Sequence, residues 1–146
     1  MSGTFDALQV GQTFVTPAHV VTDEDHASLV ARGGYTHPLF TDASFAATTP
    51  LGRSPLPGQA VLLLMGGLVE QSGRFDDTVI ALVGFEEVLF RRPVFPGDTI
   101  RVEVSVDSKE PRDDGRRGLL GMTWRCVNDR DEAAVEASAH MLFRRD

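Results

Sequence analysis

Hydrophobic and polar residues alternate with a period of two through the second half of the chain, a pattern typical of β-strands with one buried face. The strand candidates are residues 78–92, 101–106, 119–127 and 135–143. Turn-forming sequences separate them at 95–98, 113–115 and 128–131. The second half therefore predicts four consecutive strands.

The first half predicts one short strand and two short helices. The strand covers residues 13–21 and contains Pro17, which favours a sheet edge or a bulge because proline has no N–H to donate. Thr22, with an acid three residues later, predicts the N-cap of a helix that the glycine pair at 33–34 ends. Asp42 predicts the N-cap of a second, shorter helix.

Residues 58–71 are hydrophobic on nearly every side, and a helix with this pattern must be buried. A four-stranded sheet has an apolar face to cover, and this helix is the only element apolar enough to cover it. The pattern therefore predicts an α+β hot-dog fold, in which a curved antiparallel sheet wraps around a long central helix. The chain has 146 residues without a repeat or linker, so we expect one domain over residues 1–146.

Charge and composition exclude several classes of function. The chain has 14 basic and 21 acidic residues, a net charge of −7, which argues against a nucleic-acid partner because such binding depends on basic side chains neutralising phosphates. A phosphate-bearing ligand can still bind a local basic cluster such as residues 91–92 or 116–117. The longest apolar run is about half of a membrane span, and the N-terminus lacks a secretory signal pattern. We therefore expect a cytoplasmic protein with no membrane contact.

The single cysteine, Cys126, cannot form an internal disulfide. It alternates with Met122 and Trp124 on a strand candidate, which predicts a buried, inert thiol. No Cys/His cluster has the spacing of a zinc site. We expect neither a metal nor a cofactor.

Residues 34–42, GYTHPLFTD, hold a tyrosine, a histidine and an aspartate within eight positions. This stretch, the Pro57-Gly58 pair and residues 84–106 (GFEEVLFRRPVFPGDTIRVEVSV) occur in the order seen in MaoC-like hydratases and dehydratases, and the resemblance extends over most of the chain. That family has a hot-dog fold and is usually dimeric. Its members add water to, or remove it from, acyl chains carried as thioesters on coenzyme A or acyl carrier protein. The resemblance implies an acyl thioester as ligand and a homodimer.

The family's catalytic motif, Gly-Asp-x-Asn-Pro-Leu-His followed by an x-Asp pair, is only partly kept. The matching positions are Gly34, Pro38, Leu39 and Asp42. Tyr35 stands in place of the catalytic aspartate, Phe40 in place of the catalytic histidine, and His37 in place of the asparagine. Hydration needs a base for water and an acid for the α-carbon; phenylalanine is neither, and tyrosine, with a usual pKa of about 10, is a poor base near neutrality. The family's catalytic pair is absent.

Three roles for His37 are open from the sequence. His37 and Asp42 are five positions apart, as the family's pair is, so they are candidates for a relocated acid/base pair in which Tyr35 or Thr36 helps to hold water. His37 is alternatively a structural histidine or a ligand-binding residue. For Asp42 the helix-capping role is favoured, and Phe40 is expected to line an apolar pocket or to pack against the helix.

The Pro57-Gly58 pair begins the central helix, where backbone N–H groups lack intrahelical partners. Such an amide at the positive end of a helix can polarise a thioester carbonyl. In the family a glycine has this role, although the histidine that often precedes it is Pro57 here. The alternative is that the pair only starts the helix.

These residues give one leading hypothesis and two alternatives. The leading hypothesis is a hydratase or dehydratase that acts on an acyl thioester or a related carbonyl substrate, with His37 as acid/base, Asp42 or Tyr35 assisting, and the Gly58 amide on the carbonyl oxygen. The first alternative is a non-catalytic, acyl-binding hot-dog subunit that pairs with an active partner. The second is a cyclase or thioesterase of secondary metabolism on the same scaffold.

Overall fold

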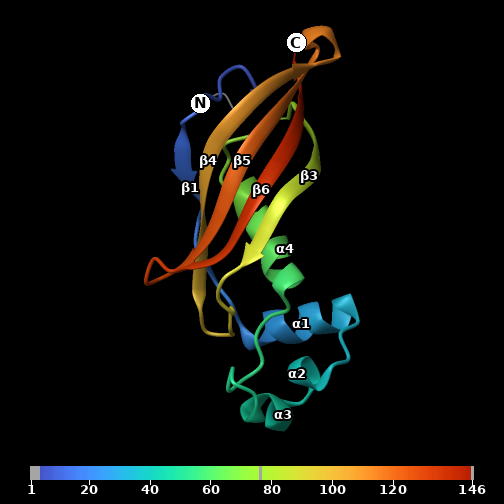
Figure 1. The fold of residues 1–146 in the computed structure, drawn as a ribbon, viewed down its shortest axis with the longest axis vertical. Coiled ribbons are helices and arrows are strands. Elements are labelled where there is room, and N and C mark those ends of the chain that lie inside the picture. The colour runs from blue at the N-terminus through green and yellow to red at the C-terminus, as the bar shows by residue number, and fades with distance from the viewer. Residues whose placement is uncertain (1–3, 76, 146) are drawn as a thin grey trace.

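A single antiparallel sheet dominates the computed structural model, which describes residues 4–75 and 77–145 (Figure 1). The long strands are β3 (Val79–Phe90), β4 (Thr99–Arg112), β5 (Arg117–Asn128) and β6 (Ala133–Arg144). These four strands are hydrogen-bonded in the order β4-β5-β6-β3. Each of them pairs with at least one other strand of the four. The four strands predicted from the period-two pattern are confirmed.

The predicted strand at 13–21 is divided into β1 (Thr13–Val15) and β2 (His19–Val20), which both pair with β4. The break falls at Pro17, which has no N–H to donate. Thr16 maintains the contact before the break, because its N–H donates to the Val102 carbonyl at 2.9 Å and its hydroxyl accepts from the Val102 N–H at 2.9 Å. The proline therefore interrupts the edge strand without separating it from the sheet.

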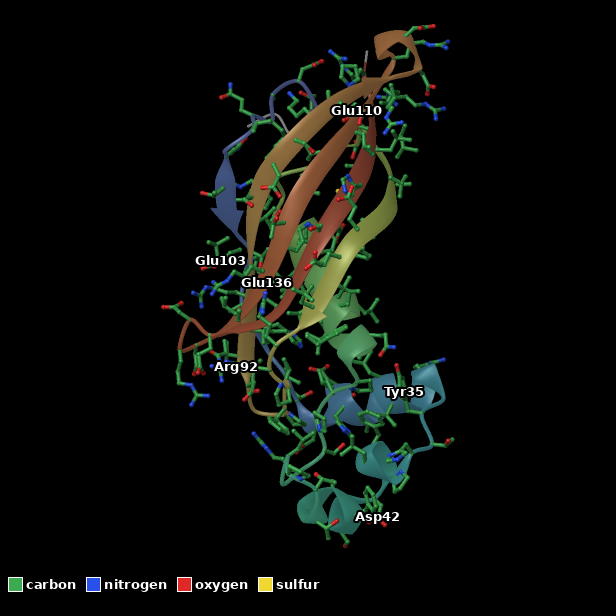
Figure 2. All side chains as sticks on the ribbon, in the orientation of Figure 1. Tyr35, Asp42, Arg92, Glu103, Glu110 and Glu136 are labelled. Atoms are coloured by element: carbon green, nitrogen blue, oxygen red, sulfur yellow. The ribbon has the colours of Figure 1, made fainter. Side chains whose placement is uncertain are left out.

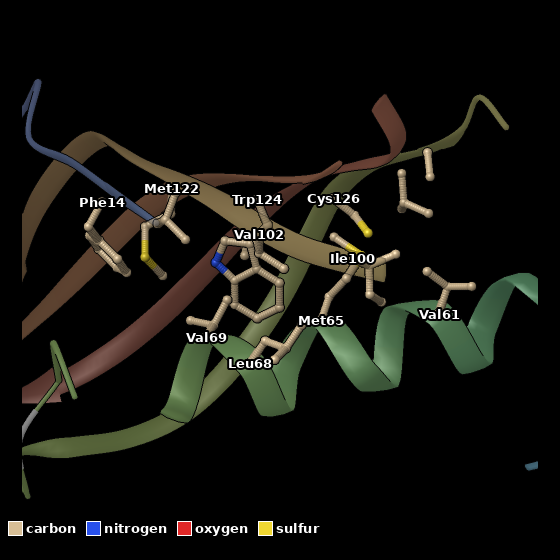
Figure 3. Packing of buried hydrophobic residues seen from close by; sticks show 14 of the residues in the cluster. Phe14, Val61, Met65, Leu68, Val69, Ile100, Val102, Met122, Trp124 and Cys126 are labelled. Atoms are coloured by element: carbon tan, nitrogen blue, oxygen red, sulfur yellow. The ribbon is translucent and has the colours of Figure 1, made fainter. Parts of the chain in front are cut away.

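The helix α4 (Gly58–Gln71) lies along one face of the curved sheet and has the bounds that the sequence predicts (Figure 1). Met65, Leu68 and Val69 are at most 3% exposed and belong to the same hydrophobic core as Trp124 of β5 (Figure 3). A sheet wrapped around a central helix is the predicted α+β hot-dog arrangement, which is thereby confirmed.

Trp124 occupies the centre of the contact between sheet and helix. Its indole lies 4.0 Å from the point where a β-carbon would stand on Gly66 of α4, and it meets the Phe85 ring edge-on at 5.7 Å. Its Nε1–H has no hydrogen-bond partner among the described residues. Two positions along the strand, Cys126 is fully buried, and burial raises the pKa of its thiol to about 12. The predicted inert thiol is confirmed.

One side of α4 is open, so the prediction that the helix is buried all round is wrong at Leu63, which is 64% exposed. The strand β3 is also open, because it ends the sheet and, among the described strands, pairs with β6 alone. Ile80, Leu82 and Val83 of β3 are about half exposed. The single chain thus leaves hydrophobic side chains of α4 and β3 in contact with solvent.

The helix α1 (Asp23–Gly33) begins and ends as predicted. The Thr22 hydroxyl accepts the Asp25 N–H at 3.0 Å, and the Asp25 carboxylate accepts the Thr22 N–H at 3.0 Å. This backbone hydrogen bond, with a 2.8 Å contact to His19, lowers the pKa of Asp25 below its usual value. At the other end Gly34 has φ of 71°, the left-handed conformation that closes a helix.

Two shorter helices, α2 (Pro38–Thr41) and α3 (Ala43–Thr48), follow α1. Together the three helices lie beyond the N-terminal end of α4, away from the sheet (Figure 1). The predicted 34–42 motif is therefore on this helical extension. None of the described helices is long and apolar enough to cross a membrane.

The two ends of the described chain meet at the opposite end of the molecule (Figure 1). The rings of Phe5 and Phe143 are 6.2 Å apart, and Arg145 forms a 2.8 Å ion pair with Asp6. Phe5 is 2% exposed, and its ring lies 2.5 Å from the point where a β-carbon would stand on Gly118. A glycine at 118 is what lets the N-terminal segment pack onto β5.

Candidate functional site

A cavity of about 480 Å³ opens at the N-terminal end of α4. Residues from four parts of the chain line it: the loop before α4, the first turn of α4, the end of β3 with the segment that follows it, and the start of β6. The lining includes Leu56, Gly58, Gln59, Phe90, Arg92 and Val94. Its walls are mainly hydrophobic, with arginines at positions 91 and 92.

Backbone amides at the start of α4 supply polar donors to this cavity. Pro57 is the N-cap, has no N–H, and leaves the helix without a side-chain cap. The amides of Gly58 and Gln59 have no acceptor within residues 4–75 and 77–145. Unpaired N–H groups at a helix start carry partial positive charge and favour an oxygen that is gaining negative charge. Pro57 itself is buried, and the residues that line the cavity do not include it.

Phe90, the last residue of β3, lies directly over Gly58. A β-carbon on Gly58 would stand 2.9 Å from the nearest ring atom of Phe90. Because glycine has no such atom, the ring and the first turn of α4 can approach this closely. Phe90 is 53% exposed, so its ring covers part of the cavity mouth without being locked in the core.

Tyr35 is the residue of the 34–42 motif that the structure connects to α4. Its hydroxyl donates to the Gln59 side-chain oxygen at 3.1 Å, and Figure 2 shows Tyr35 close to the first turn of α4. The Tyr35 ring meets the Phe40 ring edge-on at 5.3 Å. Phe40 is half-buried and packs against Tyr35, whereas the cavity lining does not include it.

His37 caps the helix α2. Its Nδ1 accepts the Leu39 N–H at 3.0 Å, and its ring meets Phe45 edge-on at 5.8 Å. An Nδ1 that accepts a hydrogen bond leaves the proton of the neutral ring on Nε2. His37 therefore presents an N–H donor, and taking up a proton at Nδ1 would break the cap. Whether His37 transfers a proton stays a prediction.

Asp42 is the N-cap of α3, as the sequence predicts. Its Oδ1 accepts the Ser44 N–H at 3.0 Å and the Phe45 N–H at 3.2 Å. No hydrogen bond or ion pair joins Asp42 to His37 in the described part of the chain. Asp42 lies on the helical extension at the far end from the sheet (Figure 2), and Thr36 is exposed. The two members of the predicted pair each cap a separate short helix.

Sequence reasoning missed Gln59 and Phe90. Gln59 is the one polar side chain in an otherwise hydrophobic helix start, and that exception was a usable signal. Phe90 had no such signal, because a phenylalanine ending an apolar strand is ordinary. Within the described residues no group of three or more His, Cys, Asp or Glu side chains could hold a metal ion.

Comparison with known proteins agrees with this geometry. Residues 6–122 match the family model described as a MaoC like domain. A structure titled as a monoamine oxidase regulatory protein from Archaeoglobus superposes with a TM-score of 0.90 at 31% identity, covering 98% of this chain and 95% of that chain. The fold is therefore shared over nearly the whole of both chains.

Two curated relatives are longer proteins. Protein MaoC of Klebsiella aerogenes is 28% identical over 84% of this chain and 41% of its own length. Beta-methylmalyl-CoA dehydratase of Chloroflexus aurantiacus is 27% identical over 97% of this chain and 40% of its own length. The chain thus spans about two fifths of these relatives. Since the family model covers most of the sequence, the chain belongs to the MaoC-like domain family.

Proposed function

We propose that this domain binds an acyl thioester in the cavity beside the start of α4, which we call the acyl cavity, and catalyses hydration or dehydration of its acyl chain. The observation that carries the proposal is the uncapped start of α4, where the Gly58 and Gln59 amides have no acceptor among the described residues and lie beside a hydrophobic cavity. The family membership and the named activity of a relative, a CoA-thioester dehydratase, support the same reaction class. The cytoplasm remains the predicted location.

The amides at the start of α4 would hold the thioester carbonyl oxygen. Addition of water to a 2-enoyl thioester places hydroxide on the β-carbon and negative charge on that oxygen, and a proton then reaches the α-carbon. N–H groups aimed at the oxygen stabilise the charge as it develops. Hydrophobic walls exclude water from the acyl chain and so strengthen this interaction.

Tyr35 is the side chain best supported for handling water. Its hydroxyl donates to the Gln59 oxygen, which leaves the two N–H donors of the Gln59 amide for other partners. Gln59 lines the cavity, so this pair would orient a water molecule next to the double bond. His37 would contribute through its Nε2–H, as a donor that binds, because its Nδ1 already caps α2.

A hydration assay on but-2-enoyl-CoA tests these assignments. Tyr35→Phe keeps the ring against Phe40 and removes only the hydroxyl, so we expect kcat/KM to fall by about 10²-fold. His37→Ala and Asp42→Ala each lose a helix cap, with a cost of about 1 kcal/mol in unfolding free energy and little change in kcat. Loss of the enoyl absorbance gives the rate, and urea unfolding gives the stability.

Two outcomes would contradict this arrangement. Full activity in Tyr35→Phe would remove Tyr35 from the reaction. His37 would be restored as the acid/base if His37→Ala lowered kcat by about 10²-fold or more while its free energy of unfolding fell by no more than the cost of a lost cap, about 1 kcal/mol.

A non-catalytic binding subunit is the second candidate, and a specific observation favours it. His37 and Asp42 are both engaged as caps, and Phe40 packs on Tyr35. Such a subunit would bind a saturated acyl thioester, but neither the wild type nor any variant would hydrate an enoyl thioester. Binding without turnover, with activity appearing when a second hot-dog chain is added, would decide for this candidate.

We also propose a homodimer formed through β3 and α4. No described segment pairs with the outer edge of β3, and hydrophobic side chains of β3 and Leu63 of α4 are exposed beside it. An unpaired strand edge bordered by apolar side chains favours pairing with another chain. A second copy, related by a two-fold axis, would bury the outer edge of β3 and the exposed hydrophobic side chains, and each chain would make the same contacts.

Light scattering checks the dimer against the chain mass of 15.9 kDa. We expect twice this mass for the wild type. Leu63→Glu should weaken dimerisation by at least about tenfold, because a buried unpaired carboxylate is costly. Leu51→Glu is the matched control, since Leu51 is 40% exposed and lies between α3 and α4, away from β3. A monomeric wild type, or a Leu63→Glu variant that dimerises normally, would refute this interface.

A further inference from the structure

A hollow of about 290 Å³ lies on the outer face of the sheet, the face turned away from α4, and we call it the outer hollow. Residues of all four long strands line it. Its place on this face follows from β6, where Ala139 is in the core and the next residue, His140, points the other way. The outer hollow shares no lining residue with the acyl cavity, and Figure 2 shows Glu110, one of its residues, near the end of the sheet opposite α1. It is therefore a separate feature of the domain.

Two glycines keep the outer hollow open on both sides of His140. The strand register places Gly84, His140, Gly121 and Ser108 in one row across β3, β6, β5 and β4. A β-carbon on Gly84 would meet no atom within 4 Å, so this position faces open space. A β-carbon on Gly121 would collide with the Ser108 hydroxyl and would stand 3.4 Å from the His140 ring. Neither glycine has a positive φ, and glycine inside a strand weakens it, so these two positions fit the close approach of a ligand.

Both side walls of the outer hollow contain β-bulges. The strand β3 changes register against β6 on either side of residues 84–85, and β4 changes register against β5 just before Ser108. A bulge turns side chains away from their regular direction, and bulges are frequent beside active sites. Where β5 pairs with β6, the register shifts at residues 126–127, outside the lining. The two walls are therefore irregular at residues that line the hollow.

Two pairs of polar side chains line the outer hollow. His140 Nε2 lies 3.2 Å from a Glu86 carboxylate oxygen, and Arg112 donates to the Glu110 carboxylate at 3.3 Å. In each pair the second carboxylate oxygen has no partner among the described residues. The Ser108 hydroxyl can donate as well as accept. The hollow therefore presents hydrogen-bond donors beside acceptors at several points.

The charges in the outer hollow favour an uncharged ligand. The guanidinium of Arg112 neutralises one of the two carboxylates, and the other, Glu86, is 76% exposed and stays hydrated without a cation. An anion would be repelled by both carboxylates. Neighbouring hydroxyl groups, each a donor and an acceptor, match the polar pairs. Val83, which is 53% exposed, and Leu119 add apolar surface that the C–H groups of a ring can contact.

We infer that the outer hollow binds a small uncharged sugar, of the size of one monosaccharide. Ring hydroxyls would bind the two polar pairs, and the C–H face of the ring would contact Val83 and Leu119. The volume of about 290 Å³ is near the lower limit for small-molecule sites, about 300 Å³, so a longer saccharide would extend into solvent. This binding goes beyond the proposed function and does not depend on an acyl thioester.

Nuclear magnetic resonance of the ¹⁵N-labelled protein tests this inference, with glucose, galactose, mannose and ribose as probes. At least one of these sugars should shift the amide signals of Gly84, Gly121 and His140 in a saturable way, with a dissociation constant of about 1 mM. The Gly58 signal, in the acyl cavity, should not move. Cyclohexanol keeps a ring but has a single hydroxyl, so it should bind at least about tenfold more weakly because most of the hydrogen bonds are lost.

Gly84→Val separates binding from folding. Its side chain would point into open space, so we expect a melting temperature close to that of the wild type and no saturable sugar binding. Arg112→Ala should weaken binding by about tenfold, the loss of one charged hydrogen bond. Arg125→Ala is the matched control and should bind as the wild type does, because Arg125 also pairs with a glutamate on this face, at 2.7 Å from Glu103, and does not line the outer hollow.

Several results would overturn the inference. One is the absence of a saturable shift with all of the named sugars, and another is normal binding by Gly84→Val. Tighter binding of 1,4-diaminobutane than of every sugar would mean that the carboxylates select a cation. Equal losses in Arg112→Ala and Arg125→Ala would show a general effect of surface charge instead of a site. None of these results bears on the proposed hydration, whose assay uses another cavity.

Discussion

Replacing Trp124 with alanine should lower the free energy of unfolding by about 3–5 kcal/mol, the usual cost of emptying a large aromatic site. Trp124 is 2% exposed and lies between β5 and Gly66 of α4, with the Phe85 ring against its edge. Its removal would leave a cavity at the centre of the contact between sheet and helix. Urea unfolding followed by circular dichroism measures the change.

Trp124→Phe is the control for this result. The smaller ring keeps much of the contact with α4 and also removes the Nε1–H, which has no partner among the described residues. An unpaired buried donor costs about 1–3 kcal/mol, so its removal offsets part of the lost packing. We expect Trp124→Phe to cost well under half as much as Trp124→Ala. Equal losses in both variants would mean that the indole N–H has a partner, such as a buried water molecule.

Gly58→Ala should reduce kcat/KM for but-2-enoyl-CoA by about 10²-fold, because displacements of roughly 1 Å near a reacting group have effects of this size. The new β-carbon would stand 2.9 Å from the Phe90 ring, which must move across the cavity mouth. Stability should change little, because the helix preference of alanine over glycine, about 0.5–1 kcal/mol in a helix interior, is offset by the displacement of the Phe90 ring. Steady-state kinetics should therefore show a large loss while the melting temperature stays close to that of the wild type.

The double variant Gly58→Ala with Phe90→Leu tests the cause. Leucine has no ring at the point of collision, so much of the lost kcat/KM should return. If Gly58→Ala alone has full activity, the close contact between Phe90 and Gly58 does not shape the site. If the double variant stays inactive, the alanine lowers activity by changing the backbone N–H at position 58 and not by displacing the Phe90 ring.

The elements of the fold were predictable because each depends on local chemistry. The bounds of α4 follow from Pro57 and from the run of apolar residues after it, and Thr22 with Asp25 begins α1 through hydrogen bonds within one turn. The strands follow from alternation along a few residues. The exposure of Leu63 was not predictable in this way, because a hydrophobic helix face looks the same whether its own sheet or another chain covers it.

The candidate site was less predictable because it depends on distant segments. Phe90 and Gly58 are 32 positions apart in the sequence, yet the close contact between them shapes the cavity mouth. His37 shows the converse, because its residue type suggests proton transfer while its Nδ1 caps the helix that Pro38 begins. The motif at 34–42 predicts a site in this region, but the hydrogen bond from Tyr35 to Gln59 depends on the fold and has no signal in the sequence.

The meeting of the chain ends has a consequence for protein engineering. The contacts between Phe5 and Phe143 and between Asp6 and Arg145 bring both ends to one pole of the molecule, while the acyl cavity is at the N-terminal end of α4. Chains with adjacent termini generally tolerate circular permutation. A short linker between residues 4 and 145, with new termini in the exposed turn at residues 113–114, would reorder the strands in the sequence while leaving the cavity lining at Phe90 and Gly58 unchanged.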